Sequence, residues 1–309
     1  MTDVAVIAAR LGLYLTLAIT FGLPCFVFWA WRDGRRSPPG PWAWIVGIAT
    51  LLAMILSVFQ LIALAASMSG TALTAVDRAT ISMLLDGGAM GRAWKVRVGA
   101  LLVILMALIL TRRAPGASRM VSAAGGGVAL ATMAWFGHGA SDEGAAGWTP
   151  LVADLAHLWA AGVWTGALVG LSWLLLRSPN DASHGHAALC ERALGGFSGL
   201  GTLIVATLVV TGLINTWFLI GIDHIASLMA DPYGRLLLVK LAAFGCMIVL
   251  AALNRYRLTP ALERVLKESG DAARSLSRLR VSLLTETAML TTILGLVAWF
   301  GTLSPPAGG

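Results

Sequence analysis

The chain contains a series of long apolar runs, and these limit its possible folds more than any other feature. Its 309 residues are 58% hydrophobic and only 12% charged, with a mean hydropathy of +0.81. In a soluble domain about a quarter of the residues are charged, so most of this chain is not expected to lie in water. Runs of about 20 apolar residues suit helices that cross a bilayer, because a helix satisfies its own backbone hydrogen bonds there. The sequence therefore predicts an all-α, polytopic transmembrane helical bundle embedded in a lipid bilayer.

Eight apolar segments define this bundle, which we interpret as a single transmembrane domain over residues 1–309. The expected spans cover residues about 4–30, 42–68, 95–111, 120–138, 150–176, 195–219, 236–254 and 282–302. No basic region precedes the first run, so we expect it to stay as a helix and not to be removed as a signal peptide. Tryptophans near span ends are expected at the membrane interface: Trp42, Trp44, Trp148, Trp217 and Trp299.

Positive charges gather in alternate loops, and this pattern predicts the orientation of the bundle. The net charge is +7, and arginines and lysines are concentrated after spans one, three, five and seven. The loop 139–149 has no cation and carries Asp142 and Glu143. The basic loops are expected in the cytoplasm, which puts both termini in the periplasm of a bacterial inner membrane. Because this charge explains topology, we do not expect nucleic acid as a partner.

The remaining loops and glycine clusters are interpreted as structural. Residues 69–94 are expected to form a short surface helix, and residues 255–281 an amphipathic basic helix that rests on anionic lipid. Glycines at 125–127 and 195–201 indicate close helix packing, since no strand precedes them as a phosphate loop would require. The three cysteines form no CxxC pair, and His184 and His186 are expected in a solvated loop. No ATP-binding motif is visible, and we do not expect an enzyme.

Asp154 and His157 form the first candidate site. They lie three residues apart in the fifth expected span, so a helix places them on one face. Ionisable groups within a span are costly in hydrocarbon and usually face a bundle interior or a water-filled cavity. His157 is either a metal ligand or a satisfied buried histidine, and Asp154 either a further ligand or the acceptor that fixes the imidazole tautomer. Small residues on the same span favour close helix contact: Ala160, Ala161, Gly162, Gly166 and Ala167.

His138 ends the preceding span and can converge with this pair near the outer mouth, because antiparallel helices joined by a short loop are usually neighbours. His157 lies roughly 10 Å below the start of its span, at about 1.5 Å per residue, whereas His138 lies near the lip. The two histidines therefore form either one site or two successive stations. Imidazole suits copper, zinc, iron or nickel, and thioether selects copper(I). Methionines expected in the outer half are Met68, Met83, Met90, Met133 and Met229.

Other charged residues also fall inside expected spans. Arg10, Arg97 and Lys240 lie in outer halves, where snorkelling explains Arg97 and Lys240 as well as function does. Arg10 could pair with Asp154, which would weaken the metal interpretation. Glu286, near the inner end of the last span, could line an inner exit or cap the helix region near Arg280.

Several motifs follow one another in the second half of the chain: His157-Leu-Trp-Ala-Ala-Gly-Val-Trp-Thr-Gly166, Phe197-Ser-Gly-Leu with Thr211-Gly212-Leu, Pro232-Tyr-Gly-Arg-Leu-Leu-Leu-Val-Lys240, Asn254-Arg-Tyr-Arg-Leu-Thr-Pro260 and Glu286. In their wording and order they resemble the copper resistance protein D (CopD) family of bacterial inner-membrane proteins. The resemblance is firmest over about 150–302. It implies copper homeostasis: uptake or transfer of copper ion across the inner membrane, beside a periplasmic copper carrier of the CopC type.

The sequence thus predicts a copper-handling permease with His138, Asp154 and His157 as metal ligands. A haem-binding or electron-transfer membrane protein is the alternative, although axial haem ligation needs histidines at matching depth on facing helices. A copper-binding assembly factor or sensor without transport is a third interpretation.

Overall fold

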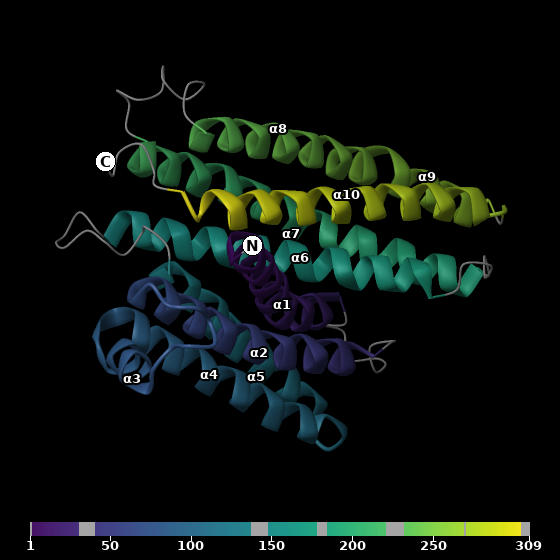
Figure 1. The fold of residues 1–309 in the computed structure, drawn as a ribbon. Coiled ribbons are helices and arrows are strands. Elements are labelled where there is room, and N and C mark those ends of the chain that lie inside the picture. Colours follow the sequence, from purple (N-terminus) through teal and green to yellow (C-terminus); the bar gives the residue numbers. More distant parts are fainter. Residues whose placement is uncertain are drawn as a thin grey trace.

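The computed structural model describes residues 2–30, 41–136, 148–177, 184–220, 232–268 and 270–303. Over these ranges the protein consists of helices and short connections and contains no strand (Figure 1). The elements are α1 (Thr2–Ala30), α2 (Trp42–Ser69), α3 (Arg78–Asp86), α4 (Gly88–Ile109), η1 (Leu110–Arg112), α5 (Pro115–Ala131), η2 (Thr132–Phe136), α6 (Trp148–Leu176), α7 (His184–Ile220), α8 (Pro232–Leu253), the π-helical turn η6 (Asn254–Leu258), α9 (Thr259–Lys267) and α10 (Ala273–Phe300).

Seven of the described helices are long and apolar enough to cross a bilayer. They coincide with all the expected spans except the fourth, at about 120–138. That segment falls on α5, which has 17 residues and passes directly into the 3-10 helix η2. The two parts together rise roughly 35 Å, at about 1.5 Å per residue in an α-helix and about 2.0 Å in a 3-10 helix. The protein is therefore a helical membrane protein, whose described residues include seven candidate spans and one further two-part segment.

Helix α1 lies at the centre of the bundle and packs against α2, α5, α6 and α10 (Figure 1). Its closest contact is with α6 and is made through glycines. A Cβ on Gly22 would lie 1.8 Å from the carbonyl oxygen of Gly162, and one on Gly166 would lie 1.9 Å from the carbonyl carbon of Gly22. Because no side chain fits there, the two backbones touch directly. This confirms that the small residues of α6 serve close helix packing.

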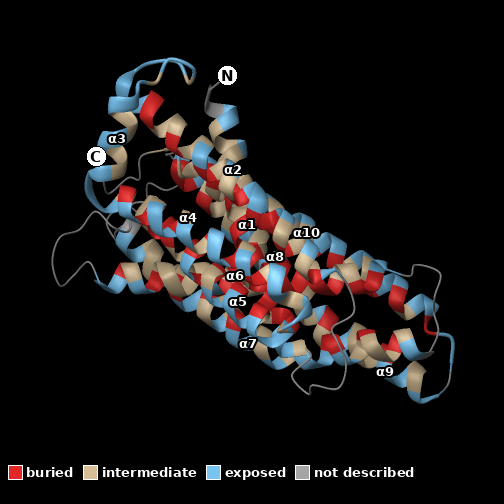
Figure 2. Ribbon diagram, turned by 90° about the horizontal axis from the view of Figure 1, so that it is seen from below, coloured by how far each residue is buried: buried red, intermediate tan, exposed pale blue. Residues whose placement is uncertain are grey.

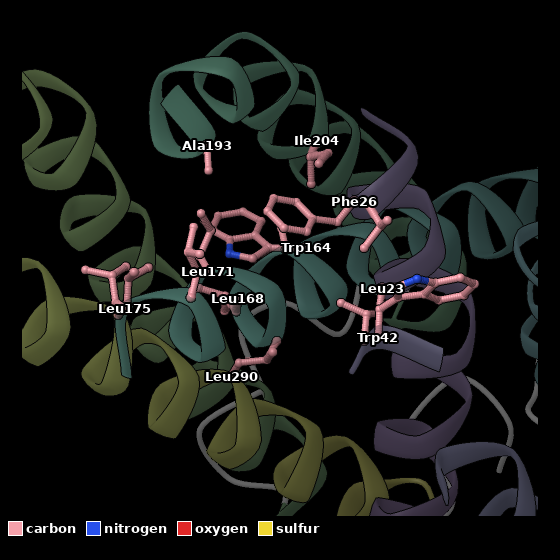
Figure 3. Close-up of a cluster of buried hydrophobic side chains, with 14 of the residues drawn as sticks. Leu23, Phe26, Trp42, Trp164, Leu168, Leu171, Leu175, Ala193, Ile204 and Leu290 are labelled. Carbon is pink, nitrogen blue, oxygen red and sulfur yellow. The ribbon is translucent and has the colours of Figure 1, made fainter. Parts of the chain in front are cut away.

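The hydrophobic core follows the length of α6. In Figure 3, Trp164, Leu168 and Leu171 of α6 lie among side chains of α1 and α7, such as Phe26 and Ile204. Figure 2 shows buried residues along the middle of the bundle and exposed ones on its outer faces. Many exposed side chains are large and apolar, including Ile109, Leu213 and Val249. A soluble protein rarely exposes so much contiguous apolar surface, which fits contact with lipid.

Some expectations about single residues are wrong. Trp42 is only 8% exposed and packs in the core (Figure 3), whereas Trp44, Trp148, Trp217 and Trp299 are exposed as expected. The glycines at 125–127 do serve packing, since a Cβ on Gly126 would lie 2.7 Å from Cα of Phe21. Gly196 and Gly199, in contrast, face open space. They therefore do not mediate close helix contact within the described chain.

Of the two surface helices expected from the sequence, the structure contains one as expected and not the other. The short helix α3 is present, with no buried residue, and Asp77 caps it by accepting a hydrogen bond from the Thr80 amide at 2.9 Å. The basic segment 255–281 is not one separate helix. Helix α8 continues through η6 into α9, and the chain then turns into α10. Pro260 lies in the first turn of α9 and has no N–H to donate to the preceding turn, which favours the wider π-helical hydrogen bonding before it.

Side-chain contacts identify which helix ends lie together. Nη1 of Arg10 donates to the carbonyl oxygen of Gly301 at 2.6 Å, and the rings of Tyr233 and Phe300 are 5.3 Å apart. The N-terminal part of α1, the start of α8 and the end of α10 therefore share one end of the bundle. At the opposite end, Nε of Arg280 donates to the carbonyl oxygen of Leu175 at 2.8 Å. We refer to these as the outer and inner ends, following the charge pattern of the sequence.

Candidate metal site

His157 is half-buried on α6 and points toward α7, not toward lipid. Its Nδ1 lies 2.9 Å from Oγ1 of Thr211, a buried residue of α7. The same Oγ1 lies 2.6 Å from the carbonyl oxygen of Thr207, which can only accept. The Thr211 hydroxyl hydrogen is therefore donated to that carbonyl, and the Thr211 oxygen accepts from Nδ1–H of His157. A neutral imidazole protonated at Nδ1 has its lone pair on Nε2.

This hydrogen bond leaves one ring nitrogen of His157 without a proton. Within the described chain, Nδ1 has a protein partner while Nε2 has no hydrogen-bond partner. Metal-binding histidines almost always donate their second N–H to an acceptor of the protein, which fixes the ring and its tautomer. Gly212 leaves room beside the ring, since even a Cβ there would be 3.7 Å from Cε1 of His157. Nδ1 of the imidazole is thus fixed by Thr211, whereas the lone pair of Nε2 has no hydrogen-bond donor among the described residues.

Asp154 lies one turn closer to the outer end of α6 and is also half-buried. Its carboxylate lies within electrostatic range of the Lys240 ammonium on α8 and of the Tyr14 phenol on α1. The alternative of an Arg10–Asp154 ion pair is not realised among the described residues, whose ion pairs are Lys95–Asp86 and Lys267–Glu263. Asp154 is therefore not neutralised by Arg10, and it lies one turn from His157 on α6.

Lys240 faces the bundle at the outer end. Its Nζ lies 5.5 Å from the ring centroid of Phe300, and its charge lies within electrostatic range of Asp154 and His157. A cation here repels a bound metal ion but attracts the carboxylate. Lys240 thus completes a small polar cluster formed by residues of α1, α6, α7 and α8: Tyr14, Asp154, His157, Thr211 and Lys240.

Arg97 does not snorkel. Its side chain is 0% exposed; Nε donates to Oγ1 of Thr132 at 2.7 Å, and Nη1 donates to Oε1 of Gln60 at 2.8 Å. Its guanidinium also lies 4.5 Å from the ring centroid of Phe136. Arg97 therefore ties together α2, α4 and η2 in the outer half of the bundle. Gln60, a polar residue within an otherwise apolar span, was the sequence signal for this partner.

His138 lies outside the described residues, as do His224 and Met229. Met133, in contrast, is a core residue that is 4% exposed, while Met68 and Met83 are exposed. Within the described chain, no group of three or more His, Cys, Asp or Glu side chains is close enough to hold a metal ion. Of the three predicted ligands, the structure thus describes two, Asp154 and His157, on one helix.

The inner end contains a second imidazole, which is not in a solvated loop as expected. His186 lies in the first turn of α7, and its Nε2 is 3.6 Å from Sγ of Cys190, which is fully buried. The two residues are one turn apart on the same helix face. Sequence reasoning missed this contact because α7 begins at His184, well before the expected start of the span at 195.

Comparisons with known proteins identify the family. A family model described as "Copper resistance protein D-like, N-terminal domain" matches residues 1–148, and one described as "Copper resistance protein D" matches residues 191–300. Copper resistance protein D of Pseudomonas syringae pv. tomato is 38% identical over 309 residues, which covers 99% of this chain and 98% of that protein. The chain belongs to the copper resistance protein D family. The resemblance read from the sequence is confirmed.

The chain is also similar, at lower identity, to inner membrane protein YebZ of Escherichia coli (strain K12). It is 25% identical over 211 residues, 68% of this chain and 69% of that protein. No solved structure matches the chain. Helix α6, which carries Asp154 and His157, lies between the segments matched by the two family models, whereas Thr211 and Lys240 lie within the second. For this copper resistance protein D family member, the ligand assignment therefore depends on local geometry.

Proposed function

We propose that this protein is a copper permease of the bacterial inner membrane that takes copper from the periplasm inward. The observation that carries the proposal is the His157–Thr211 hydrogen bond, which leaves Nε2 of the imidazole unprotonated inside the outer half of the bundle. A neutral imidazole is a good ligand for copper. We propose a carrier for copper and not an enzyme.

The proposed topology has eight spans, with α5 and η2 together forming the fourth, and both termini in the periplasm. Copper is then the cargo, received at the outer end from a separate periplasmic carrier of the CopC type. His138, Asp154 and His157 are the proposed ligands. The carboxylate of Asp154 would balance part of the positive charge of the ion.

Copper accumulation in cells tests this function. Cells that produce the His157→Ala or His138→Ala protein should accumulate less copper and change in copper sensitivity relative to wild type. His186→Ala is the matched control, because it removes an imidazole from the opposite end of the bundle. Uptake and sensitivity unchanged in both outer variants would rule out the ligand assignment.

The alternatives predict other outcomes with purified protein. A haem-binding or electron-transfer protein would show a Soret band. The described residues contain no pair of facing histidines that could ligate a haem. An assembly factor or sensor would bind copper but never move it across a liposome membrane. Copper flux into proteoliposomes that is lost in His157→Ala would support the permease against both.

A further inference from the structure

Asn254 and Glu286 meet in the interior of the bundle although they lie 32 residues apart. Asn254 begins the π-helical turn η6 at the end of α8, and Glu286 lies on α10. Nδ2 of Asn254 donates a hydrogen bond to Oε1 of Glu286. The two residues are 7% and 3% exposed, so little of the pair is accessible to solvent.

The carboxyl group of Glu286 has no cationic partner in the described part of the chain. An ionised carboxylate buried without such a partner is strongly unfavourable in a low-dielectric interior. Nearby cations are directed elsewhere: Arg255 donates to Ser198 and Thr202 of α7, and Arg280 donates to the carbonyl oxygen of Leu175. Other charged residues of the helices packed on α10 are either exposed or lie at the outer end: Arg10, Asp154, His157, Arg235, Lys240, Arg257, Glu263, Arg264 and Lys267.

One polar atom of the Asn254–Glu286 pair lacks a hydrogen bond, and a proton on Glu286 would supply the missing donor. Oδ1 of Asn254 is buried and has no hydrogen-bond partner. An ionised carboxylate can only accept, so it offers this oxygen nothing, whereas a protonated carboxyl gains one O–H donor. Protonation of Glu286 would thus remove a buried charge and supply a donor beside the unsatisfied amide oxygen. The π-helical turn is a second sign of function, because such turns occur frequently at functional sites.

We propose that Glu286 and Asn254 form a proton-binding site between α8 and α10. Binding adds one proton from water to the carboxylate and gives a neutral carboxylic acid; release leaves a buried negative charge that disfavours the packed arrangement of the two helices. Lys240 and Asn254 are on the same continuous helix, separated by 14 residues, or roughly 21 Å. Movement of α8 on proton release would therefore reach the outer polar cluster. If the copper permease function proposed above holds, this site couples copper movement to protons.

Carbodiimide labelling of the purified protein tests proton binding without copper. Dicyclohexylcarbodiimide reacts with protonated carboxyl groups in apolar surroundings. Mass spectrometry should find an adduct on Glu286 that decreases as the pH is raised. Glu286→Gln should abolish it, and Glu263→Gln, which changes an exposed carboxylate, should leave it intact. Labelling of Glu286 that does not depend on pH would overturn the proposal.

Infrared difference spectroscopy provides a second measurement that does not require reagent access. Wild type should show the carbonyl band of a protonated carboxylic acid that disappears at high pH and is absent from Glu286→Gln. Absence of this band from wild type at every pH would also overturn the proposal. Asn254→Leu keeps similar volume and removes the amide that donates to Glu286, so it should shift the pH at which the band disappears.

Coupling is tested separately in proteoliposomes. Copper flux of wild type should increase with a proton gradient, while Glu286→Gln should keep copper binding and lose the response to the gradient. Absence of any copper flux in wild type would reject the permease function but leave the labelling result valid. A Glu286→Gln protein that responds to the gradient like wild type would reject the coupling.

Discussion

The imidazole of His157 on α6 donates its Nδ1 hydrogen to the hydroxyl oxygen of Thr211 on α7. This bond connects two helices and determines which ring nitrogen carries the lone pair. Thr211 thus selects which nitrogen of His157 could bind a metal, although Thr211 is not itself one of the proposed ligands. Predictions about copper binding can therefore be made for Thr211 as well as for His157.

Thr211→Val should weaken copper binding by about 10- to 100-fold, the usual cost of removing a hydrogen-bond acceptor behind a metal-binding histidine. Valine has nearly the same shape but cannot accept from Nδ1–H. Competition of the purified protein with a chromophoric copper(I) chelator measures the effect. Thr207→Val is the control, since that side chain bonds only within its own helix, to Leu203. Equal affinities of the Thr211→Val protein and wild type would contradict this role of the bond.

Gly166→Ala should destabilise the protein by more than the about 1–3 kcal/mol typical of an extra methylene in a packed core. The added Cβ would lie 1.9 Å from the backbone of Gly22, and a backbone cannot change rotamer to make room. Thermal unfolding in detergent, followed by size-exclusion chromatography, measures the change. Gly199→Ala should have almost no effect, because nothing lies within 4 Å of a Cβ there. Similar melting temperatures for the two variants would be inconsistent with the α1–α6 contact.

Arg97→Lys should lower the melting temperature although it keeps the charge. An ammonium group cannot reproduce the planar arrangement with which Arg97 reaches both Thr132 and Gln60. Each hydrogen bond from a charged donor contributes about 1.5–3 kcal/mol. Arg92→Lys, on an exposed position of the same helix, is the control. A melting temperature unchanged by Arg97→Lys would mean that the buried guanidinium does not hold α2, α4 and η2 together.

Helix α3 should lose its N-terminal order at acid pH. Hydrogen bonds from Thr80, first its side chain and then its backbone N–H, lower the pKa of Asp77 below the usual value of about 4. Since the folded pKa is below the unfolded one, the stabilisation is complete above the unfolded pKa and is lost as the pH falls through the folded pKa. Hydrogen exchange at the Thr80 amide should therefore accelerate below about pH 4. In Asp77→Asn, which can still cap the helix, exchange corrected for its intrinsic pH dependence should lack this transition.

The fold was predictable where the signal is local. Apolar runs and their polar breaks located the helices because a span must satisfy its own hydrogen bonds and match the bilayer thickness. The burial of Trp42 and the open space at Gly199 were not predictable, since both depend on which helix is the neighbour. The continuous helix from α8 into α9 was missed because the charges of the segment suggested a separate surface element.

In the candidate site, too, only the relationships within one helix were predictable from the sequence. The shared face of Asp154 and His157 follows from their spacing on one helix. Thr211 is 54 residues from His157, and Glu286 is 32 residues from Asn254, so helix periodicity says nothing about either contact. Each depends on the order in which the spans pack around α1. Only the three-dimensional arrangement joins the separate polar residues into pairs.

The glycine contact between α1 and α6 also limits how this bundle can move. Two backbones in direct contact have no side chains between them that could change rotamer, so we expect α1 and α6 to move together as one unit. Helix α8 packs chiefly against α10, carries Lys240 of the polar cluster, and continues into η6, where Asn254 contacts Glu286. If the protein exposes its site to the two sides of the membrane in turn, we expect α8 and α10 to move relative to α1 and α6.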